Sequence, residues 1–216
     1  MSIRIILYLF LSLLFTPGIS FAQSSAINFS EEEIAFIKNH PTIKVANEMD
    51  WPPFDYNEFG KPKGLAIDYI KLLAKKAGLQ IDFIHGPSWD ELLQLLKQKQ
   101  IDVIPAIYKN QQRESFILFT PPYYKGKLGV YEYHSDSFTP HAPDLLRKRV
   151  GIQKNHGAIP IIKSQIPGIE LIEIPSPETL VKMLGTQRLD AIIGNPLLFE
   201  HFAKENQITQ LYLSHY

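Results

Sequence analysis

The sequence predicts an α/β protein with two similar lobes, each built on a mainly parallel sheet flanked by helices. Three observations lead to this fold class. Helical and strand-like hydrophobic periods alternate along the chain, a unit of 24 residues occurs twice, and a Pro- and Gly-containing extended stretch separates the two copies. Alternating strands and helices are typical of α/β proteins.

The first half of the chain predicts the order β-α-β-α-β after one leading helix. Ser30 and Ser88 are each followed three residues later by Glu, a capping-box pattern that begins a helix. The expected elements are a helix between Ser30 and Pro41, a strand at 43–46, a helix at 65–77, a strand at 79–84, a helix after Ser88 and a strand at 101–107. This order implies a parallel sheet with right-handed crossovers.

The second half repeats the first. Residues 81–104 and 169–192 align without a gap at an offset of 88, and each copy reads as strand, Pro-Ser cap, helix, polar turn and strand. Any βαβ unit shares some of this pattern, but an ungapped match over 24 residues favours a structural repeat. We therefore expect two lobes, each with its own sheet, and a ligand cleft between them.

The amino terminus resembles a signal peptide. Arg4 precedes an apolar run at 5–15, and Ser20 and Ala22 suit cleavage after Ala22. The run is shorter than the ~20 residues of a membrane span, although an uncleaved anchor is the alternative. We expect residues 1–22 to be a signal peptide, 23–122 lobe one, 123–143 a crossover and linker, and 144–216 lobe two. The mature protein is then periplasmic, without a membrane span.

Composition excludes several functions. The 22 basic and 22 acidic residues are balanced without a basic run, which argues against a nucleic-acid partner. The absence of Cys excludes disulfides, iron–sulfur clusters and thiolate zinc. No HxH, HExxH, GxGxxG, GxxxxGK[ST] or GxSxG pattern occurs, so we expect no metal, no cofactor and no catalytic residues.

Candidate ligand-binding residues follow the strands. Trp51 and Phe54 flank a Pro-Pro corner and offer flat apolar surfaces, although Phe54 also suits a core position. Trp89 begins a helix, either at the cleft edge or packed on the sheet. Arg113 has a donor fork that fits a carboxylate, unless it pairs with a nearby acid such as Glu114.

The second lobe offers two more candidates. The polar turn at 153–158, which contains Asn155, His156 and Gly157, precedes a helix and can bind an anion through its backbone N–H groups. Asn195 follows a strand and can both donate and accept hydrogen bonds, but it equally suits the cap of a helix that begins at Pro196.

The order of these segments resembles the bacterial extracellular solute-binding proteins of family 3, the two-lobed Venus-flytrap periplasmic proteins. It is most similar to the variety found as sensor domains of BvgS-like histidine kinases. The segments that carry the resemblance are 36–45, 51–55, 64–69, 89–93, 101–106, Arg113 with 119–124, 150–154 and 189–195. The resemblance covers residues 31–213.

The resemblance implies a binding protein rather than an enzyme. By position, it implies ligand contacts from Glu48 and Trp51, stacking by Trp89, and a carboxylate grip by Arg113 assisted by the turn at 155–157. Asn195 stands where amino-acid binders place an Asp for the ligand ammonium, and Tyr108 where they place a small hydroxyl residue. We therefore expect closure on a small polar, carboxylate-bearing ligand, an amino acid or organic acid.

The resemblance leaves the role of the chain open. Its partner is an ABC importer or a membrane sensor protein, so uptake and signalling are both possible, as is a periplasmic dehydratase-like enzyme on this fold. Family members continue from lobe two back into lobe one, and that return is not found before Tyr216. A truncated lobe two in a non-binding remnant is therefore a further alternative.

Overall fold

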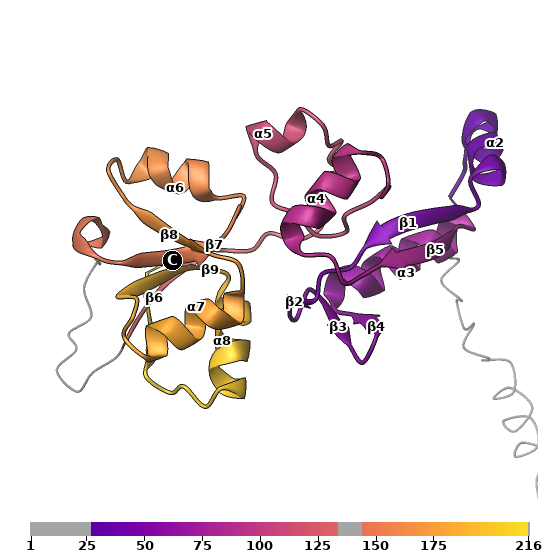
Figure 1. The fold of residues 1–216 in the computed structure, drawn as a ribbon. Coiled ribbons are helices and arrows are strands. Elements are labelled where there is room, and N and C mark those ends of the chain that lie inside the picture. Colours follow the sequence, from indigo (N-terminus) through magenta and orange to yellow (C-terminus); the bar gives the residue numbers. More distant parts are fainter. Residues whose placement is uncertain (1–26, 134–143, 216) are drawn as a thin grey trace, which may run out of the picture.

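The computed structural model describes residues 27–133 and 144–215. The expected signal peptide at 1–22 and the expected linker residues 134–143 lie outside the described residues. Figure 1 shows two groups of strands and helices side by side, joined by the segment that leads from α5 to β6. The predicted α/β fold with two lobes is confirmed.

Lobe one contains two small sheets. Strands β1 (Thr42–Ala46) and β5 (Gln80–Ile84) pair in parallel, and a separate antiparallel sheet has the order β2-β3-β4. The other elements of this lobe are α2 (Glu31–Asn39), β2 (Asp50–Trp51), β3 (Asp55–Glu58), β4 (Lys61–Lys63), α3 (Leu65–Ala77), α4 (Trp89–Lys97) and α5 (Gln111–Glu114). The small antiparallel sheet was not expected from the sequence.

The strand expected at 101–107 is wrong in extent. Only one β-bridge joins this segment to β1, between Val103 and Val45, with Ala46 N donating to the Val103 carbonyl oxygen and Asp102 N donating to that of Lys44. Pro105 has no N–H group, so the ladder cannot continue past it. The segment therefore leaves the sheet and leads into the loop before α5.

The helix termini of lobe one follow the sequence signals. Both expected capping boxes are present, with the backbone N–H of Ser30 donating to Glu33 and that of Ser88 donating to Glu91, each at 2.7 Å. Helix α3 ends at Gly78, whose φ of 72° lies in the left-handed region that favours glycine.

Lobe two contains one mixed sheet in the order β10-β6-β9-β7-β8. Strand β7 pairs in parallel with β8 and β9, whereas β6 is antiparallel to both β9 and β10, so this sheet is only partly parallel. Its elements are β6 (Gly129–Tyr133), the 3-10 turn η2 (Leu145–Arg147), β7 (Val150–Gln153), α6 (Ile159–Gln165), β8 (Leu171–Ile174), α7 (Pro177–Gly185), β9 (Ala191–Gly194), α8 (Pro196–Glu205) and β10 (Leu211–His215).

The sequence repeat corresponds to equivalent elements. Helices α4 and α7 begin at Trp89 and Pro177, which are 88 residues apart, and the bridging residue Val103 aligns with Ala191 at the start of β9. Each copy therefore places a strand, a helix and a return to the sheet in the same order.

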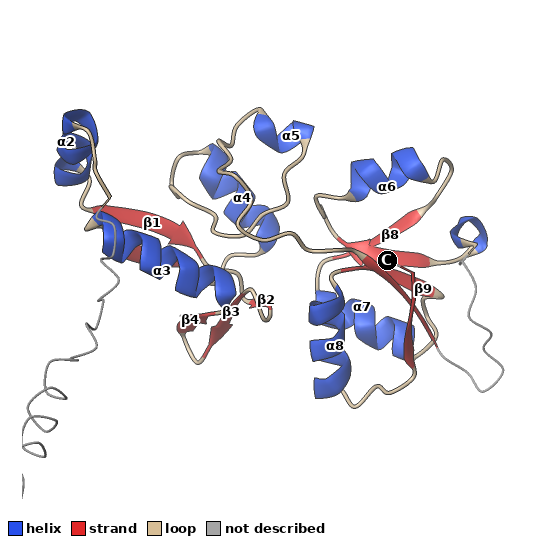
Figure 2. Ribbon diagram, turned by 180° about the vertical axis from the view of Figure 1, so that it is seen from behind, coloured by secondary structure: helices blue, strands red, loops and turns tan. Residues whose placement is uncertain are grey.

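Packing differs between the lobes. Helices α7 and α8 cover one face of the lobe-two sheet and α6 covers the other (Figure 2), each over a buried apolar cluster. Among the described residues, the buried cluster of lobe one is smaller, with Ala46, Leu92 and Ile101 at its centre and partly buried side chains packed against them. Within the described residues, no helix has the length and hydrophobicity needed to cross a membrane.

Candidate ligand-binding site

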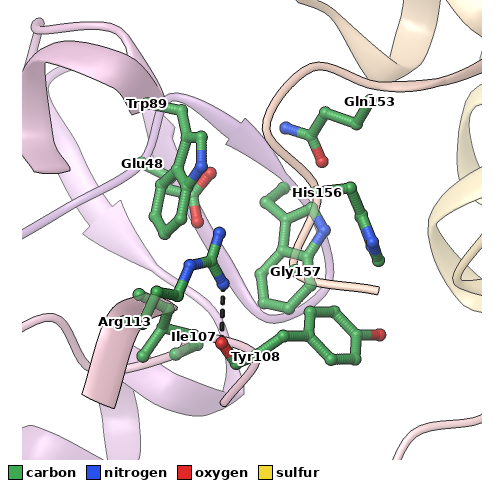
Figure 3. A pocket seen from close by; sticks show the side chains of 10 residues that line it. Glu48, Trp89, Ile107, Tyr108, Arg113, Gln153, His156 and Gly157 are labelled. Carbon is green, nitrogen blue, oxygen red and sulfur yellow. Dashed lines mark hydrogen bonds between the residues drawn. The ribbon is translucent and has the colours of Figure 1, made fainter. Parts of the chain in front are cut away.

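A small cavity lies between the two lobes. Its volume is about 20 Å³. Side chains from lobe one and lobe two face each other across it in Figure 3, with Glu48, Trp89 and Arg113 on one side and Gln153, His156 and Gly157 on the other. The lining residues are Glu48, Trp51, Trp89, Ala106, Ile107, Tyr108, Arg113, Gln153, His156 and Gly157. Seven of the nine residues expected from the sequence therefore surround one space.

Arg113 is the central cation of this cavity. Its short helix is capped by Asn110, whose side chain accepts from Arg113 N at 2.9 Å. The guanidinium group is buried, lies 5.4 Å from the centre of the Trp89 ring, and donates to the carbonyl oxygens of Tyr108 at 2.6 Å and Asn155 at 2.9 Å. These bonds use only part of its five-donor fork, so Arg113 retains donors for an anion.

Arg113 stays charged at neutral pH despite its burial. Burial lowers its pKa to about 10, and the nearby Glu48 carboxylate opposes that shift. A buried guanidinium bonded to neutral carbonyl groups keeps an uncompensated charge, because a carbonyl oxygen carries only a partial negative charge. The site is therefore suited to a negatively charged partner.

Glu48 faces the same cavity, and its carboxyl group is buried near two other acidic side chains. It is 7% exposed, and no hydrogen bond to its carboxyl group is found among the described residues. Burial, followed by the charges of Asp55 and Asp50, raises the pKa of Glu48 well above its ordinary value, while Arg113 lowers it. A hydrogen-bond donor or a cation placed beside Glu48 would be stabilised there.

Asp55 holds the Glu48 loop in place. One of its carboxyl oxygens accepts from the Asn47 side chain at 2.7 Å and from the backbone N–H of Glu48 at 3.2 Å. Asn47 also accepts from Asn57 at 3.0 Å, so this network ties the end of β1 to β3. The sequence analysis missed Asp55, because nothing around it in the sequence indicates that a carboxylate there is buried.

His156 and Gly157 bring lobe two against Arg113. Burial, assisted by the Arg113 charge, lowers the pKa of His156 to about 4, so the imidazole is neutral at neutral pH. Its Nδ1 atom accepts from the backbone N–H of Ala158 at 3.2 Å, which leaves the proton on Nε2. A Cβ atom on Gly157 would lie 2.7 Å from Arg113 Nη1, so only glycine permits this approach.

Two predicted residues lie outside the cavity. Phe54 is buried, and its ring centre lies 4.9 Å from that of Trp51 and 5.1 Å from that of Tyr124. It therefore takes the core position that the sequence offered as the alternative. Asn195 caps α8, accepting from Leu197 N at 3.0 Å, which agrees with the helix-cap alternative. Both instead line a larger groove of about 850 Å³, whose other lining residues come mainly from lobe one.

Direct contacts hold the two lobes together around the cavity. Lys154 pairs with Asp90 at 2.6 Å, and the Asn155 side chain donates to the same carboxylate. Asn110 donates to the Gly157 carbonyl oxygen at 3.2 Å. On the other side, Trp51 packs against the apolar cluster of lobe two. The lobes are therefore in contact on both sides of the cavity.

The structure adds Ala106 and Ile107 to the cavity lining and Asp90 to the contacts between the lobes. Gln153 and Lys154 belong to the polar turn predicted at 153–158, where Gln153 lines the cavity and Lys154 pairs with Asp90. These contacts depend on how two distant segments meet, which no local spacing reveals. No cluster of metal-ligating side chains is found among the described residues.

Two α/β lobes with a buried cation and aromatic rings around a cavity between them define a two-lobed binding protein. Residues 43–210 match the bacterial extracellular solute-binding proteins, family 3, and the chain belongs to that family. The resemblance inferred from the sequence is confirmed.

Relatives of known name include sensor and amino-acid-binding proteins. The chain is 25% identical over 178 residues to the virulence sensor protein BvgS of Bordetella pertussis, covering 81% of this chain and 14% of BvgS. It is 27% identical over 170 residues to a probable histidine-binding protein of Campylobacter jejuni, covering 76% and 64%. The L-cystine-binding protein TcyJ of Escherichia coli is 23% identical over 192 residues, covering 87% and 72%.

Solved structures share the fold. The periplasmic VFT2 domain of Bordetella pertussis BvgS matches with a TM-score of 0.77 at 22% identity, covering 87% of this chain and 80% of that domain. An ancestral arginine-binding protein bound to glutamine matches with a TM-score of 0.69 at 23% identity, covering 82% and 79%. The named relatives are binding and sensor proteins rather than enzymes, in agreement with the expectation that this chain is not an enzyme.

Proposed function

We propose that this chain binds a small carboxylate-bearing solute between its lobes, in the periplasm, and presents the closed lobes to a membrane partner. The observation that carries the proposal is Arg113, a buried cation that faces the interlobe cavity and has unused donors. A planar guanidinium binds a carboxylate through two parallel hydrogen bonds, which gives both affinity and orientation.

A second polar group of the cavity favours an amino acid over a simple organic acid. Glu48 is a buried carboxyl group whose pKa burial raises well above its ordinary value, and among the described residues it forms no ion pair. An ammonium group beside it would favour its charged form. A ligand with one carboxylate and one ammonium group would satisfy Arg113 and Glu48 together. The Nε2–H of His156 supplies a further donor without adding charge.

The relatives support both an uptake and a signalling role. Among them, proteins named for histidine, L-cystine and arginine binding support an amino-acid ligand. The likeness to the BvgS VFT2 domain and to a histidine kinase sensor domain, with a TM-score of 0.74 for the latter, supports the signalling alternative. In either role, the ligand acts by stabilising one arrangement of the lobes.

The test is a ligand screen on the purified protein. Thermal shift against the amino acids and small organic acids should give hits, because a ligand at 100 times its Kd stabilises the fold by ~2.7 kcal/mol. Isothermal titration should then show that Arg113→Ala weakens each hit by at least ~30-fold, since truncating one partner of a buried charge pair costs ~2 kcal/mol or more.

Arg149→Ala is the matched control. Arg149 lies in lobe two, where its exposed side chain pairs with Asp190 at 2.6 Å, away from the cavity. This variant removes the same side chain without touching the site, so its ligand affinity should equal that of the wild type. Unchanged affinity in Arg113→Ala, or equal loss in both variants, would contradict the proposed role of Arg113.

A further inference from the structure

Tyr108 crosses from lobe one into lobe two. Its ring centre lies 4.8 Å from that of His156, and its Cβ atom lies against Gly157. The side chain of Asn195 is within hydrogen-bonding reach of the Tyr108 hydroxyl. One side chain of lobe one therefore contacts three residues of lobe two.

The backbone of Tyr108 also accepts a hydrogen bond from Arg113. The Tyr108 carbonyl oxygen accepts from Arg113 Nη1 at 2.6 Å, and the Asn155 carbonyl oxygen accepts from Nη2 at 2.9 Å (Figure 3 shows the first bond). Main-chain oxygen atoms from both lobes thus stand beside the guanidinium. This lets the lobes come together without a ligand carboxylate bridging them.

The remaining space is small. The cavity holds about 20 Å³, whereas one water molecule needs roughly 10–15 Å³ by the same measure. This is the space of one or two water molecules, so even glycine, with its five non-hydrogen atoms, has to widen the cavity, and a larger amino acid has to widen it further. The Tyr108 ring lines this space and lies against His156 and Gly157, so it is the group that a larger ligand side chain has to displace.

We propose that Tyr108 is the specificity-determining residue of this site. Its ring occupies interlobe space that a ligand side chain would need, so the protein favours amino acids with small side chains, such as glycine and alanine, over larger ones. The inference rests on the proposed function for the identity of the ligand class. A second consequence does not rest on the proposed function. The contacts of Tyr108 with lobe two hold the lobes closed in the absence of any ligand.

The first test compares ligand size. Isothermal titration of the wild type should show tighter binding of glycine and alanine than of glutamine or arginine. Tyr108→Ser should bind glutamine at least tenfold more tightly than the wild type does. Tyr69→Ser is the control, because Tyr69 is a tyrosine of lobe one that stacks on Tyr123 outside the cavity, at a ring distance of 4.5 Å. Wild-type binding of glutamine as tight as that of glycine, or the same preferences in Tyr108→Ser, would overturn the specificity.

The second test needs no ligand. The chain contains no Cys, so spin labels can be placed at Lys75→Cys on α3 and Lys163→Cys on α6, both exposed. In the ligand-free protein, Tyr108→Ser should lengthen and broaden the interlobe distance distribution measured by double electron–electron resonance. An unchanged distribution would overturn the role of Tyr108 in closure. If no amino acid binds either protein, the proposed function fails, while this measurement still decides the closure.

Circular dichroism shows whether Tyr108→Ser is folded. If it is not, Tyr108→Leu provides a smaller apolar side chain. Glutamine affinity and the interlobe distance distribution are then measured on that variant, and both should change in the same direction as expected for Tyr108→Ser. Tyr108→Phe retains the ring volume and loses only the hydroxyl. It should therefore keep the wild-type size preference, and a gain of glutamine binding in this variant would contradict a volume-based mechanism.

Discussion

Gly157→Ala separates closure of the lobes from the chemistry of the site. The φ angle of Gly157 is outside the left-handed region, so an alanine is not strained by its backbone. The added Cβ atom would lie 2.7 Å from Arg113 Nη1 and still closer to Tyr108 Cβ. Ordinary contacts begin at ~3.5 Å, so the two lobes must separate by about 1 Å at this point.

The cost follows from the bonds that this separation breaks. The Arg113–Asn155 bond of 2.9 Å and the Asn110–Gly157 bond of 3.2 Å both cross between the lobes. A neutral hydrogen bond contributes ~0.5–1.5 kcal/mol and one to a charged group ~1.5–3 kcal/mol. The closed arrangement should therefore lose ~2–4.5 kcal/mol relative to the open one, a shift of roughly 30- to 2,000-fold.

The assay is double electron–electron resonance between spin labels at positions 75 and 163, which gives the interlobe distance. Ligand affinity is measured on the same variant. Gly157→Ala should give longer and broader distances, and the affinity for a ligand of the closed form should fall in proportion to the closed fraction, by at most the same factor. Gln165→Ala, at an exposed position on α6, is the control and should leave both unchanged. A wild-type distance distribution in Gly157→Ala would refute the tight approach of Gly157 to Arg113 and Tyr108.

Three further outcomes are expected. Burial raises the pKa of Asp55 from 3.8 to about 7, so the stability that its protonated form provides is present at low pH and lost as pH rises through about 7. Urea unfolding should show Asp55→Asn gaining stability relative to the wild type as pH rises from 3.8 to 7. Leu180→Ala, at a fully buried side chain of the lobe-two core, should cost ~2–5 kcal/mol in the same assay; a smaller loss would contradict its tight packing. Asp90→Ala should change the interlobe distances only slightly, because an exposed pair such as Asp90–Lys154 contributes ~0.2–1 kcal/mol; opening as large as in Gly157→Ala would show that this pair dominates closure.

Local signals in the sequence predicted most helix boundaries. Ser30 and Ser88 cap their helices through the Glu three residues on, and Gly78 ends α3, because these motifs act through bonds within a few residues. The repeat likewise predicted α7 from α4. The small sheet of β2, β3 and β4 was missed, because its strands are two to four residues long and carry few apolar side chains.

The candidate site was predictable in its residue types but not in its contacts. Arg113, Trp89 and the turn at 156–157 follow strands, and the sheet rule brings such segments together. That the Arg113 donors meet the carbonyl oxygens of Tyr108 and Asn155 depends on the relative position of the lobes. Local sequence patterns carry no information on that position, so the hydrogen bonds from Arg113 to these two carbonyl oxygens were not predicted.

The direct contacts between the lobes bear on what a ligand can do. A ligand shifts the open–closed equilibrium only by its differential affinity for the two arrangements. Because Tyr108, Arg113 and Gly157 already join the lobes, closure does not depend on a ligand that bridges the cleft. A ligand that fits the small cavity would strengthen the closed arrangement, whereas one too large for it would bind only with the lobes apart. The same protein would then respond to the two ligands in opposite directions, with Tyr108 setting the size at which the response changes sign.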